Sequence, residues 1–261
     1  MSYRKSDFIS LGRERKIVLI LDKIVNFFIL ISLIPVLLYG FYGIWDARQV
    51  YSSADSEKYE TYRPTENDLS FDELRKINPE VFGWLTLKDT HIDYPLVHSD
   101  NNSKYVNTDV KGNFSLSGSI FLDYRNKKDF SDLNNVIYGH HMEKKTMFGE
   151  LEEFKDRAYF DVHKEGEIYY SGEWHKVEFF AFLQADAYDP YLYDVSLSGK
   201  KHQEEYLQYI KAHSLQYRQI KFKKEEHLLV LSTCTSDSTN GRHLLVGRIT
   251  ETLQKSSKGE K

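Results

Sequence analysis

A long apolar run lies near the N-terminus of the chain. Between residues 24 and 45 almost every side chain is apolar, and Asn26 and Ser32 are the polar exceptions. Such a run spans about 33 Å as a helix, which is enough for a hydrocarbon core of roughly 30 Å. Pro35 lies inside the run, and membrane helices tolerate proline. The pattern predicts a transmembrane helix over residues 24–45.

The two flanks of this run differ in charge. Basic side chains precede it: Arg4, Lys5, Arg13, Arg15, Lys16 and Lys23. Those that follow are mixed and mildly acidic: Asp46, Arg48, Asp55 and Glu57. Because basic flanks stay in the cytoplasm, we expect residues 1–23 inside the cell and the bulk of the chain outside. A cleaved signal peptide is the alternative, but the run is longer than an ordinary h-region and no small-x-small cleavage site follows it.

The segment after the anchor is polar. Residues 46–69 have few periodic apolar positions, which is typical of an extracellular stalk that is helical in part. Ser70 and Glu73 then have the spacing of a capping box, with Ser70 as the cap. A short helix is therefore predicted from there to about Ile77, ending before Pro79.

Residues 70–252 read as one β-rich domain. Eight short apolar runs separated by turn-forming residues are typical of strands: 83–87, 92–97, 119–122, 135–138, 167–170, 177–185, 227–233 and 244–249. Eight such strands favour a closed or nearly closed barrel. Residues 201–215 interrupt the pattern with helical spacing, and a further helical turn is predicted over 147–154.

Composition narrows the classes of function. The chain has 261 residues, 41% hydrophobic and 28% charged, which fits one anchor and one globular domain. A net charge of -4 gives no argument for nucleic acid binding. A single cysteine excludes a disulfide framework and a cysteine-based zinc site, and neither a metal nor a cofactor is expected. Residues 253–261 have the composition of a disordered tail.

That single cysteine, Cys234, ends an apolar strand. Side chains alternate along a strand, so Val230, Ser232 and Cys234 share one face. A lone thiol outside the cell is either an inert core residue or a reactive nucleophile. The reactive form is the thiolate, so a nucleophilic cysteine needs a basic or cationic neighbour.

Strand geometry predicts one such neighbour, and a second strand offers a candidate for the other. A polar loop after Cys234 leads to a strand that begins with Arg242, and an antiparallel pairing would set Arg242 beside the thiol. Its guanidinium can stabilise an oxyanion. A second strand breaks at Gly139 and delivers His140, which can protonate a leaving amine. His141 follows directly, but adjacent residues on an extended chain point apart, so we do not expect a metal pair.

Several segments together resemble one known family. They are Ser232-Thr233-Cys234 with Arg242 eight positions on, Tyr138-Gly139-His140-His141-Met142, and residues 77–85, 92–97, 118–123 and 146–149. These motifs resemble the class B sortases, over residues 71 to 249, and the N-terminal anchor also fits that family. One departure is Val230, where the family usually has threonine, and it bears on substrate contacts rather than on the nucleophile.

The resemblance implies an eight-stranded sortase β-barrel with N-terminal helices and a helix, residues 201–215, before strand seven. It implies a membrane-anchored cysteine transpeptidase of a Gram-positive surface. Cys234 would attack the Thr carbonyl of a C-terminal sorting signal, His140 would protonate the leaving amine, and Arg242 would support the oxyanion. Ser232 and Thr233 are the candidate substrate-binding residues; Ser232 shares the Cys234 face, so it either contacts substrate or only packs the strand. The acceptor would be an amine of a peptidoglycan precursor.

Other functions stay open on the sequence. A pilus polymerase would use a pilin lysine as the acceptor, and a hydrolytic cysteine peptidase would lose the acyl group to water. A membrane-anchored binding module would need no reactive thiol at all. Asp237 follows Cys234 in a polar loop, where it either orients a partner or is a solvated carboxylate. Specificity would lie in loops, including residues 186–199.

Overall fold

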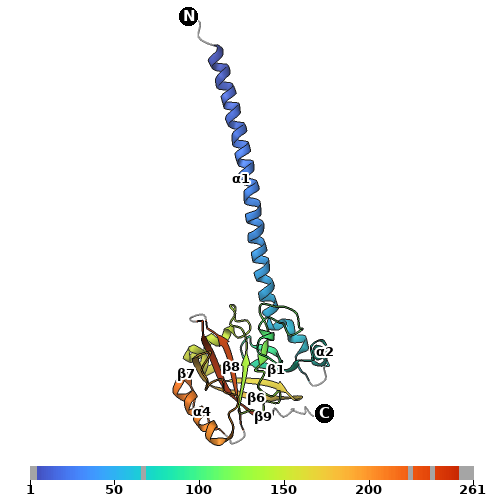
Figure 1. Ribbon diagram of the computed structural model, residues 1–261, viewed down its shortest axis with the longest axis vertical. Coiled ribbons are helices and arrows are strands. Elements are labelled where there is room, and N and C mark those ends of the chain that lie inside the picture. The colour runs from blue at the N-terminus through green and yellow to red at the C-terminus, as the bar shows by residue number, and fades with distance from the viewer. Residues whose placement is uncertain (1–4, 66–68, 223–225, 236–238, 253–261) are drawn as a thin grey trace, which may run out of the picture. The chain divides into compact units, whose positions relative to one another are not determined.

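A long helix opens the chain (Figure 1). The computed structural model describes residues 5–65, 69–222, 226–235 and 239–252, which divide into two units, residues 1–49 and 50–261. The first unit consists of most of α1 (Lys5–Ala54), which includes Pro35. In the described part of the chain, this helix alone is long and apolar enough to cross a membrane, and its apolar window is wholly unburied.

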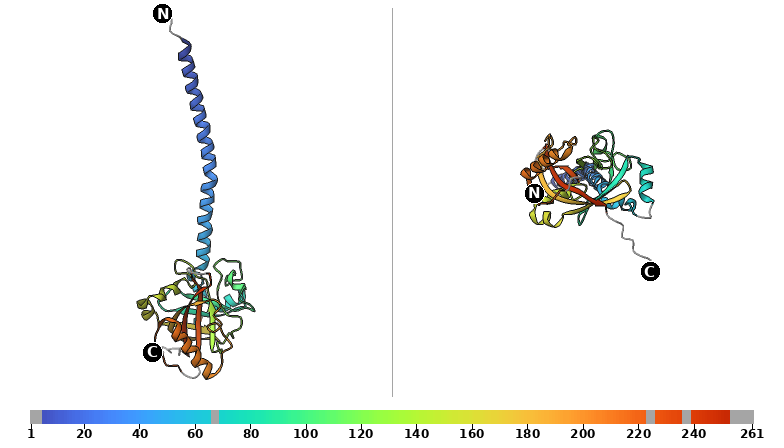
Figure 2. Two further views of the ribbon diagram at one scale, coloured as in Figure 1. Left: turned by 60° about the vertical axis from the view of Figure 1, so that its left-hand side comes forward. Right: turned by 90° about the horizontal axis from the view of Figure 1, so that it is seen from below.

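The second unit is built on a closed ring of eight strands (Figures 1 and 2). Their ring order is β5-β1-β2-β3-β4-β8-β9-β6, and β6 pairs with β5 to close it. β2 pairs with β3 in parallel, as does β4 with β8, and the other neighbours are antiparallel. The bounds are β1 (Val81–Leu87), β2 (Asp93–Val97), β3 (Ile120–Leu122), β4 (Asn134–Tyr138), β5 (Glu165–Tyr170), β6 (Glu173–Asp186), β8 (His227–Cys234) and β9 (Gly241–Thr252). The predicted eight-stranded barrel is confirmed.

A ninth strand was not predicted. β7 (Ser214–Tyr217) pairs only with β6, outside the ring. The predicted helix 201–215 is α4 (Gly199–His213), which ends when Ser214 takes an extended conformation. Leu215 therefore belongs to β7, and it is exposed rather than part of the buried helix stripe. Four residues of extended backbone carry too little periodicity to be distinguished from the end of a helix.

Two hydrophobic layers follow from strand alternation. Leu229 and Leu231 of β8 lie in the inner layer, to which all eight ring strands contribute. Leu228 and Val230 lie in an outer layer, which Tyr206 and Ile210 of α4 cover. Each fully buried side chain of this size contributes roughly 1.5–3 kcal/mol. Figure 1 shows α4 beside β7 along this outer side of the barrel.

The helices before the barrel differ from prediction in one detail. α2 (Ser70–Ile77) ends at the predicted residue, but its N-cap is Leu69, without a side-chain hydrogen bond. The Glu73 N–H donates to the Leu69 carbonyl, so Ser70 already lies within the first turn. Ser70 therefore stands one position too late to cap the helix, and the capping-box prediction was wrong. The short helices of the unit are η1 (Ser56–Tyr62), η2 (Lys104–Val106), η3 (Gly149–Lys155) and α3 (Arg157–Val162); η3 corresponds to the turn predicted over 147–154.

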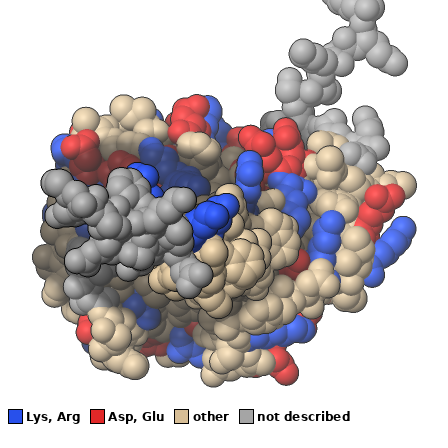
Figure 3. All heavy atoms as spheres, turned by 90° about the horizontal axis from the view of Figure 1, so that it is seen from above, with Lys and Arg blue, Asp and Glu red and all other residues tan. Residues whose placement is uncertain are grey.

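Part of the polar segment after the apolar run packs on the barrel. α1 continues to Ala54 and η1 follows, with Asp55 accepting a hydrogen bond from the Glu57 N–H. Ala54 and Tyr59 are buried in the inner hydrophobic layer. The predicted tail, residues 253–261, and Asp237 lie outside the described residues. Over the described surface in Figure 3, basic and acidic side chains are interspersed.

Candidate active site

Two parallel strands end at the same edge of the barrel. β4 pairs with β8 so that Tyr138 lies opposite Ser232, and the Gly139 N–H donates to the Ser232 carbonyl at 3.2 Å. His140 and Cys234 each come two residues after these partners. Because paired strands lie about 4.8 Å apart, this register brings the imidazole and the thiol to neighbouring strand ends.

The hairpin of β8 and β9 adds a guanidinium to the same edge. Cys234 and Arg242 lie directly opposite each other in the antiparallel register. Thr235 donates its N–H to the Gly241 carbonyl at 3.0 Å, which closes the turn onto β9. The predicted placement of Arg242 beside Cys234 is confirmed.

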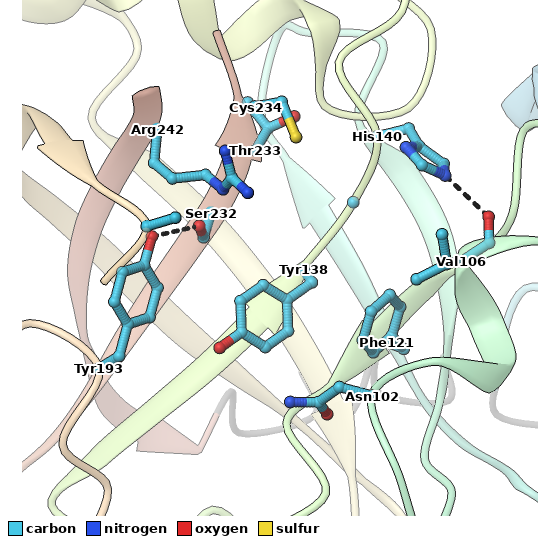
Figure 4. A pocket seen from close by; sticks show the side chains of 12 residues that line it. Asn102, Val106, Phe121, Tyr138, His140, Tyr193, Ser232, Thr233, Cys234 and Arg242 are labelled. Atoms are coloured by element: carbon cyan, nitrogen blue, oxygen red, sulfur yellow. Dashed lines mark hydrogen bonds between the residues drawn. The ribbon is translucent and has the colours of Figure 1, made fainter. Parts of the chain in front are cut away.

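These groups line a groove of about 390 Å³. Its lining residues are Asn102, Val106, Phe121, Tyr138, Gly139, His140, Ala187, Tyr193, Ser232, Thr233, Cys234 and Arg242. Figure 4 shows the Cys234 sulfur between the Arg242 side chain and the His140 ring. The Cys234 side chain is exposed, so a substrate can reach the thiol from solvent. All five residues that the sequence nominated therefore belong to one groove.

His140 is half-buried and oriented by a backbone carbonyl. Its Nε2 lies 2.7 Å from the Val106 carbonyl oxygen. Because a carbonyl only accepts, Nε2 carries the hydrogen in this arrangement, and the other ring nitrogen lies on the Cys234 side (Figure 4). Gly139 permits the close packing behind the ring, since a Cβ there would lie 2.5 Å from Ile120 Cδ1 and 2.8 Å from Phe148 Cδ2.

Arg242 is half-buried, and its guanidinium extends into the groove (Figure 4). Its Nη1 donates to the Gly241 carbonyl at 2.8 Å, which fixes one side of the fork. A guanidinium stays charged at every working pH, so it supplies a permanent positive charge beside the thiol. This charge suits either a thiolate or an oxyanion.

Ser232 and Thr233 lie differently from each other. Ser232 is buried and its Oγ lies 2.9 Å from the Tyr193 hydroxyl. Burial raises the pKa of Tyr193 to about 12, so this hydroxyl is neutral at physiological pH. Thr233 pairs with His243 and points away from the Cys234 face, and its hydroxyl is buried without a hydrogen-bond partner in the described part of the chain.

Sequence reasoning missed the polar floor of the groove. Asp123, fully buried after β3, accepts hydrogen bonds from the Arg125 guanidinium at 2.9 and 2.8 Å. It also accepts from the Tyr138 hydroxyl at 3.0 Å and from Asn102 Nδ2 at 3.1 Å. Arg125 extends further to the Tyr193 carbonyl at 3.2 Å. The network thus links Tyr138 of β4 to the segment after β3 and to the loops that carry Asn102 and Tyr193.

The groups of this polar network shift the pKa values of one another. Burial alone would raise the pKa of Asp123, but hydrogen bonds and charge from Arg125 outweigh it and keep the pKa below its usual value. The pKa of Tyr138 is raised mainly by burial and also by the nearby charge of Asp123. The Tyr138 hydroxyl therefore keeps its proton and donates a hydrogen bond. Tyr138 is the last residue of β4 and lies two residues before His140, a spacing that could have indicated it. Asn102 and Tyr193 lie in loops, where no periodicity marks them.

The fold and the groove define a class of protein. An accessible thiol beside an imidazole and a guanidinium, outside a β-barrel, is the constellation of a cysteine-dependent acyl-transfer enzyme. A family model of the sortase domain matches residues 85–250. The chain belongs to the sortase family of cell-surface transpeptidases, and its relatives identify it as class B.

Three relatives illustrate the similarity. Sortase B of Listeria monocytogenes is 33% identical over 68% of this chain and 72% of its own. A class B sortase of Streptococcus pyogenes involved in pilus biogenesis has a TM-score of 0.64 at 45% identity, over 69% of this chain and 97% of its own. Sortase B from the type II pilus of Streptococcus pneumoniae has a TM-score of 0.61 at 41% identity, over 70% and 99%.

Proposed function

We propose that Cys234 is the nucleophile of this transpeptidase and that it cleaves a C-terminal sorting signal at a Thr carbonyl. The Cys234 thiolate attacks the carbonyl carbon and forms a C–S bond. The C–N bond then breaks, and His140 gives its proton to the leaving amine. Arg242 stabilises the negative charge that develops on the carbonyl oxygen. The observation that carries the proposal is the meeting of these three groups from β8, β9 and the end of β4 in one groove.

The second half of the reaction reverses these roles. An acceptor amine attacks the thioester carbonyl, an amide bond forms, and the Cys234 sulfur leaves as a thiolate. His140 takes the proton that the amine loses, which returns the site to its starting state. The exposure of the thiol supports this step, because the acceptor must reach it after the first product departs.

We propose Ser232 and Thr233 as substrate-binding residues together with Tyr193. The hydroxyl pair of Ser232 and Tyr193 offers a donor and an acceptor on the groove wall at 2.9 Å separation. The side chain of Thr233 is buried, so its contribution is through backbone atoms beside Cys234. The aromatic wall continues with Tyr138, stacked on Tyr193 at 6.2 Å between ring centroids.

Two versions of the proposed function differ in the amine that accepts the acyl group. The 45% and 41% identical structures come from pilus-associated enzymes, which favours a pilin lysine as the acceptor. An amine of a cell-wall precursor is the second candidate, as the family resemblance of the site motifs implies. A pilin subunit and a wall-like peptide amine, offered in competition to the same acyl-enzyme, separate the two by the identity of the ligated product.

The proposed arrangement in the cell follows from the anchor. Residues 24–45 span the membrane, residues 1–23 are cytoplasmic and residues 70–252 form the external catalytic domain. Residues 46–69, expected as a stalk, link the two, and from residue 50 on they belong to the same unit as the barrel. The apolar, unburied window of α1 supports the anchor, and the basic residues before it support the orientation. Substrates and acceptors would then both be met at the outer surface.

The test is acyl transfer by the full-length protein in detergent. Threonine-containing peptide libraries are supplied with and without an added amine, and products are identified by mass spectrometry. The expected result is an amine-ligated peptide that depends on Cys234. Cleavage to a free acid that added amine does not divert would instead indicate a hydrolytic cysteine peptidase. No cleavage across the libraries would contradict both.

A further inference from the structure

The loop that carries His140 has a strained backbone. Between β4 and η3, three non-glycine residues have left-handed φ angles: Lys144 at 59°, Lys145 at 60° and Met147 at 52°. Such conformations cost energy for residues with a Cβ. The loop therefore keeps this shape only because contacts on its sides hold it.

Contacts within the loop link Met147 to His140. The Phe148 N–H donates to the His140 carbonyl at 3.0 Å, and His141 forms an antiparallel bridge with Met147. Gly149 lies so close to the loop that a Cβ there would be 1.8 Å from the Met142 carbonyl oxygen. Any shift of Met147 is therefore transmitted to the backbone of His140.

Tyr94 of β2 fixes Met147 from outside the loop. Its hydroxyl accepts a hydrogen bond from the Met147 N–H at 2.9 Å and donates one to the Ala54 carbonyl at 2.8 Å. Tyr94 is buried, and burial raises its pKa to about 12, so the hydroxyl keeps its proton and makes both bonds. The Ala54 carbonyl ends α1, where carbonyls have no partner within the helix.

A second contact joins the same helix end to the same loop. The Tyr51 hydroxyl donates to Glu143 Oε2 at 3.3 Å, and Lys144 Nζ lies 4.4 Å from the centre of the Tyr51 ring. Ser53 lies between Tyr51 and Ala54 and hydrogen-bonds Ser117 at 3.1 Å, which holds this turn on the barrel. Residues 50–54 thus contact the loop at its tip and at its base.

We propose that Tyr94 is a positioning residue, which, with Tyr51, uses the membrane-proximal end of α1 to hold His140 in place for proton transfer. The inference rests on the proposed role of His140 as the general acid. It adds that residues 50–54 are part of the catalytic apparatus and not only a connection to the anchor. A displaced imidazole still leaves the thiol free to attack, but it protonates the leaving amine poorly.

Leaving groups of different basicity test this directly. A peptide that the library screen identifies is prepared with its native amide and as a thiophenyl ester, whose thiolate departs without a proton. The readout is a single turnover of Cys234 acylation without an acceptor amine, because His140 also serves the second half of the reaction. In the full-length protein, Tyr94→Phe is expected to lower this amide turnover about 10-fold or more and the ester turnover less than about twofold. His140→Ala gives the upper limit, a loss of about 10²–10⁴ on the amide alone.

Two further variants keep the test decisive. Tyr51→Ala changes an exposed contact without disturbing the core and is expected to show the same selective loss, at smaller size. Tyr206→Phe is the matched control, since it removes one hydroxyl from a fully buried tyrosine, bonded at 2.8 Å to the Leu192 carbonyl in the outer layer. Its ratio of amide to ester turnover should equal that of the wild type.

The outcomes separate the inference from the proposed function. Equal losses on amide and ester in Tyr94→Phe, or no loss in either Tyr variant, would overturn the positioning role. A His140→Ala variant without selective loss would instead overturn the general-acid role on which it rests. Hydrogen exchange supplies an independent readout, because Tyr94→Phe is expected to speed amide exchange in residues 140–149 more than in the strands of the barrel.

Discussion

The reactive groups of the groove are held by their backbones rather than by each other. Cys234 and Arg242 are paired residues of one hairpin, and His140 follows the parallel neighbour of the same strand. Each side chain is oriented by a contact outside the trio, such as the Val106 carbonyl for His140 and the Gly241 carbonyl for Arg242. Single substitutions should therefore change chemistry more than folding.

Arg242→Lys tests the need for a forked cation. Lysine keeps the charge, but it offers a point donor in place of a planar guanidinium. We expect kcat/KM for acylation to fall about 10–100-fold with little change in unfolding free energy. Arg157→Lys, at an exposed pair with Asp161, is the control and should match wild type. Equal activity of Arg242→Lys and wild type would contradict a role for the fork.

Tyr193→Phe tests the hydroxyl pair on the groove wall. Loss of one hydrogen bond of about 1 kcal/mol should raise KM roughly fivefold and leave kcat unchanged. Because burial raises the pKa of Tyr193 to about 12, its hydroxyl stays neutral and adds no inflection to the rate profile up to about pH 10. Tyr188→Phe, on an exposed tyrosine of the same connection, serves as the control.

The sequence alone predicts the placement of some groove residues and not of others. The short turn between Cys234 and Arg242 is local, so an antiparallel pairing could be inferred from spacing alone. The approach of His140 depends on a parallel pairing of strands far apart in the chain, which alternation does not encode; the family resemblance supplied it. Tyr193 and Asn102 reach the groove from irregular loops, so neither spacing nor alternation indicates them.

A buried network of polar side chains, centred on Asp123, joins strands and loops around the groove. Asp123 after β3 binds Tyr138 of β4 and the side chain of Arg125, and Arg125 reaches the connection before α4. A buried carboxylate with these partners stabilises the arrangement only while it is charged. Substitution of Asp123 and a change of pH should therefore both alter the free energy of unfolding.

Asp123→Asn should lower the unfolding free energy by about 2–3 kcal/mol near neutral pH, as measured by urea denaturation. The pKa of Asp123 is lower in the folded state, so its contribution is present above the unfolded value of about 3.9 and disappears as pH falls below it. The difference between variant and wild type should therefore shrink below about pH 4.

Asp161→Asn is the matched control, because that carboxylate pairs with Arg157 at 2.8 Å on the exposed surface. It should cost less than about 0.5 kcal/mol at any pH. A similar cost for both variants would show that burial of Asp123 does not set its contribution.

The elements themselves were largely predictable. Every ring strand of the barrel corresponds to an apolar run with turn residues around it, because strands such as β8 are buried on both faces and read as short continuous apolar runs. The errors fall at ends: Ser70 stands inside α2 rather than at its cap, and Leu215 belongs to β7 rather than α4. Ends depend on tertiary contacts, which local propensity does not carry.

In the whole molecule, we propose that a membrane anchor carries an external enzyme. α1 supplies the apolar window and the barrel supplies the groove. Since the chain has one cysteine and that cysteine is exposed, orientation can be read from a single thiol. No added reporter is needed.

A membrane-impermeant maleimide should label Cys234 in intact cells that express the full chain. The expected result is full labelling without lysis, and none in Cys234→Ala. Labelling that requires lysis would contradict an external catalytic domain. Mass spectrometry of the labelled peptide provides the measurement.

Intact-protein mass spectrometry shows whether Cys234 carries the acyl group, as we propose. The full-length protein is incubated with a cleavable sorting peptide in the absence of any amine. We expect a mass increase equal to the acyl fragment of the peptide. This acyl group should be located on Cys234 and should pass to the ligated product when an amine is added. Product formation by Cys234→Ala, or turnover with no adduct at this residue, would contradict it.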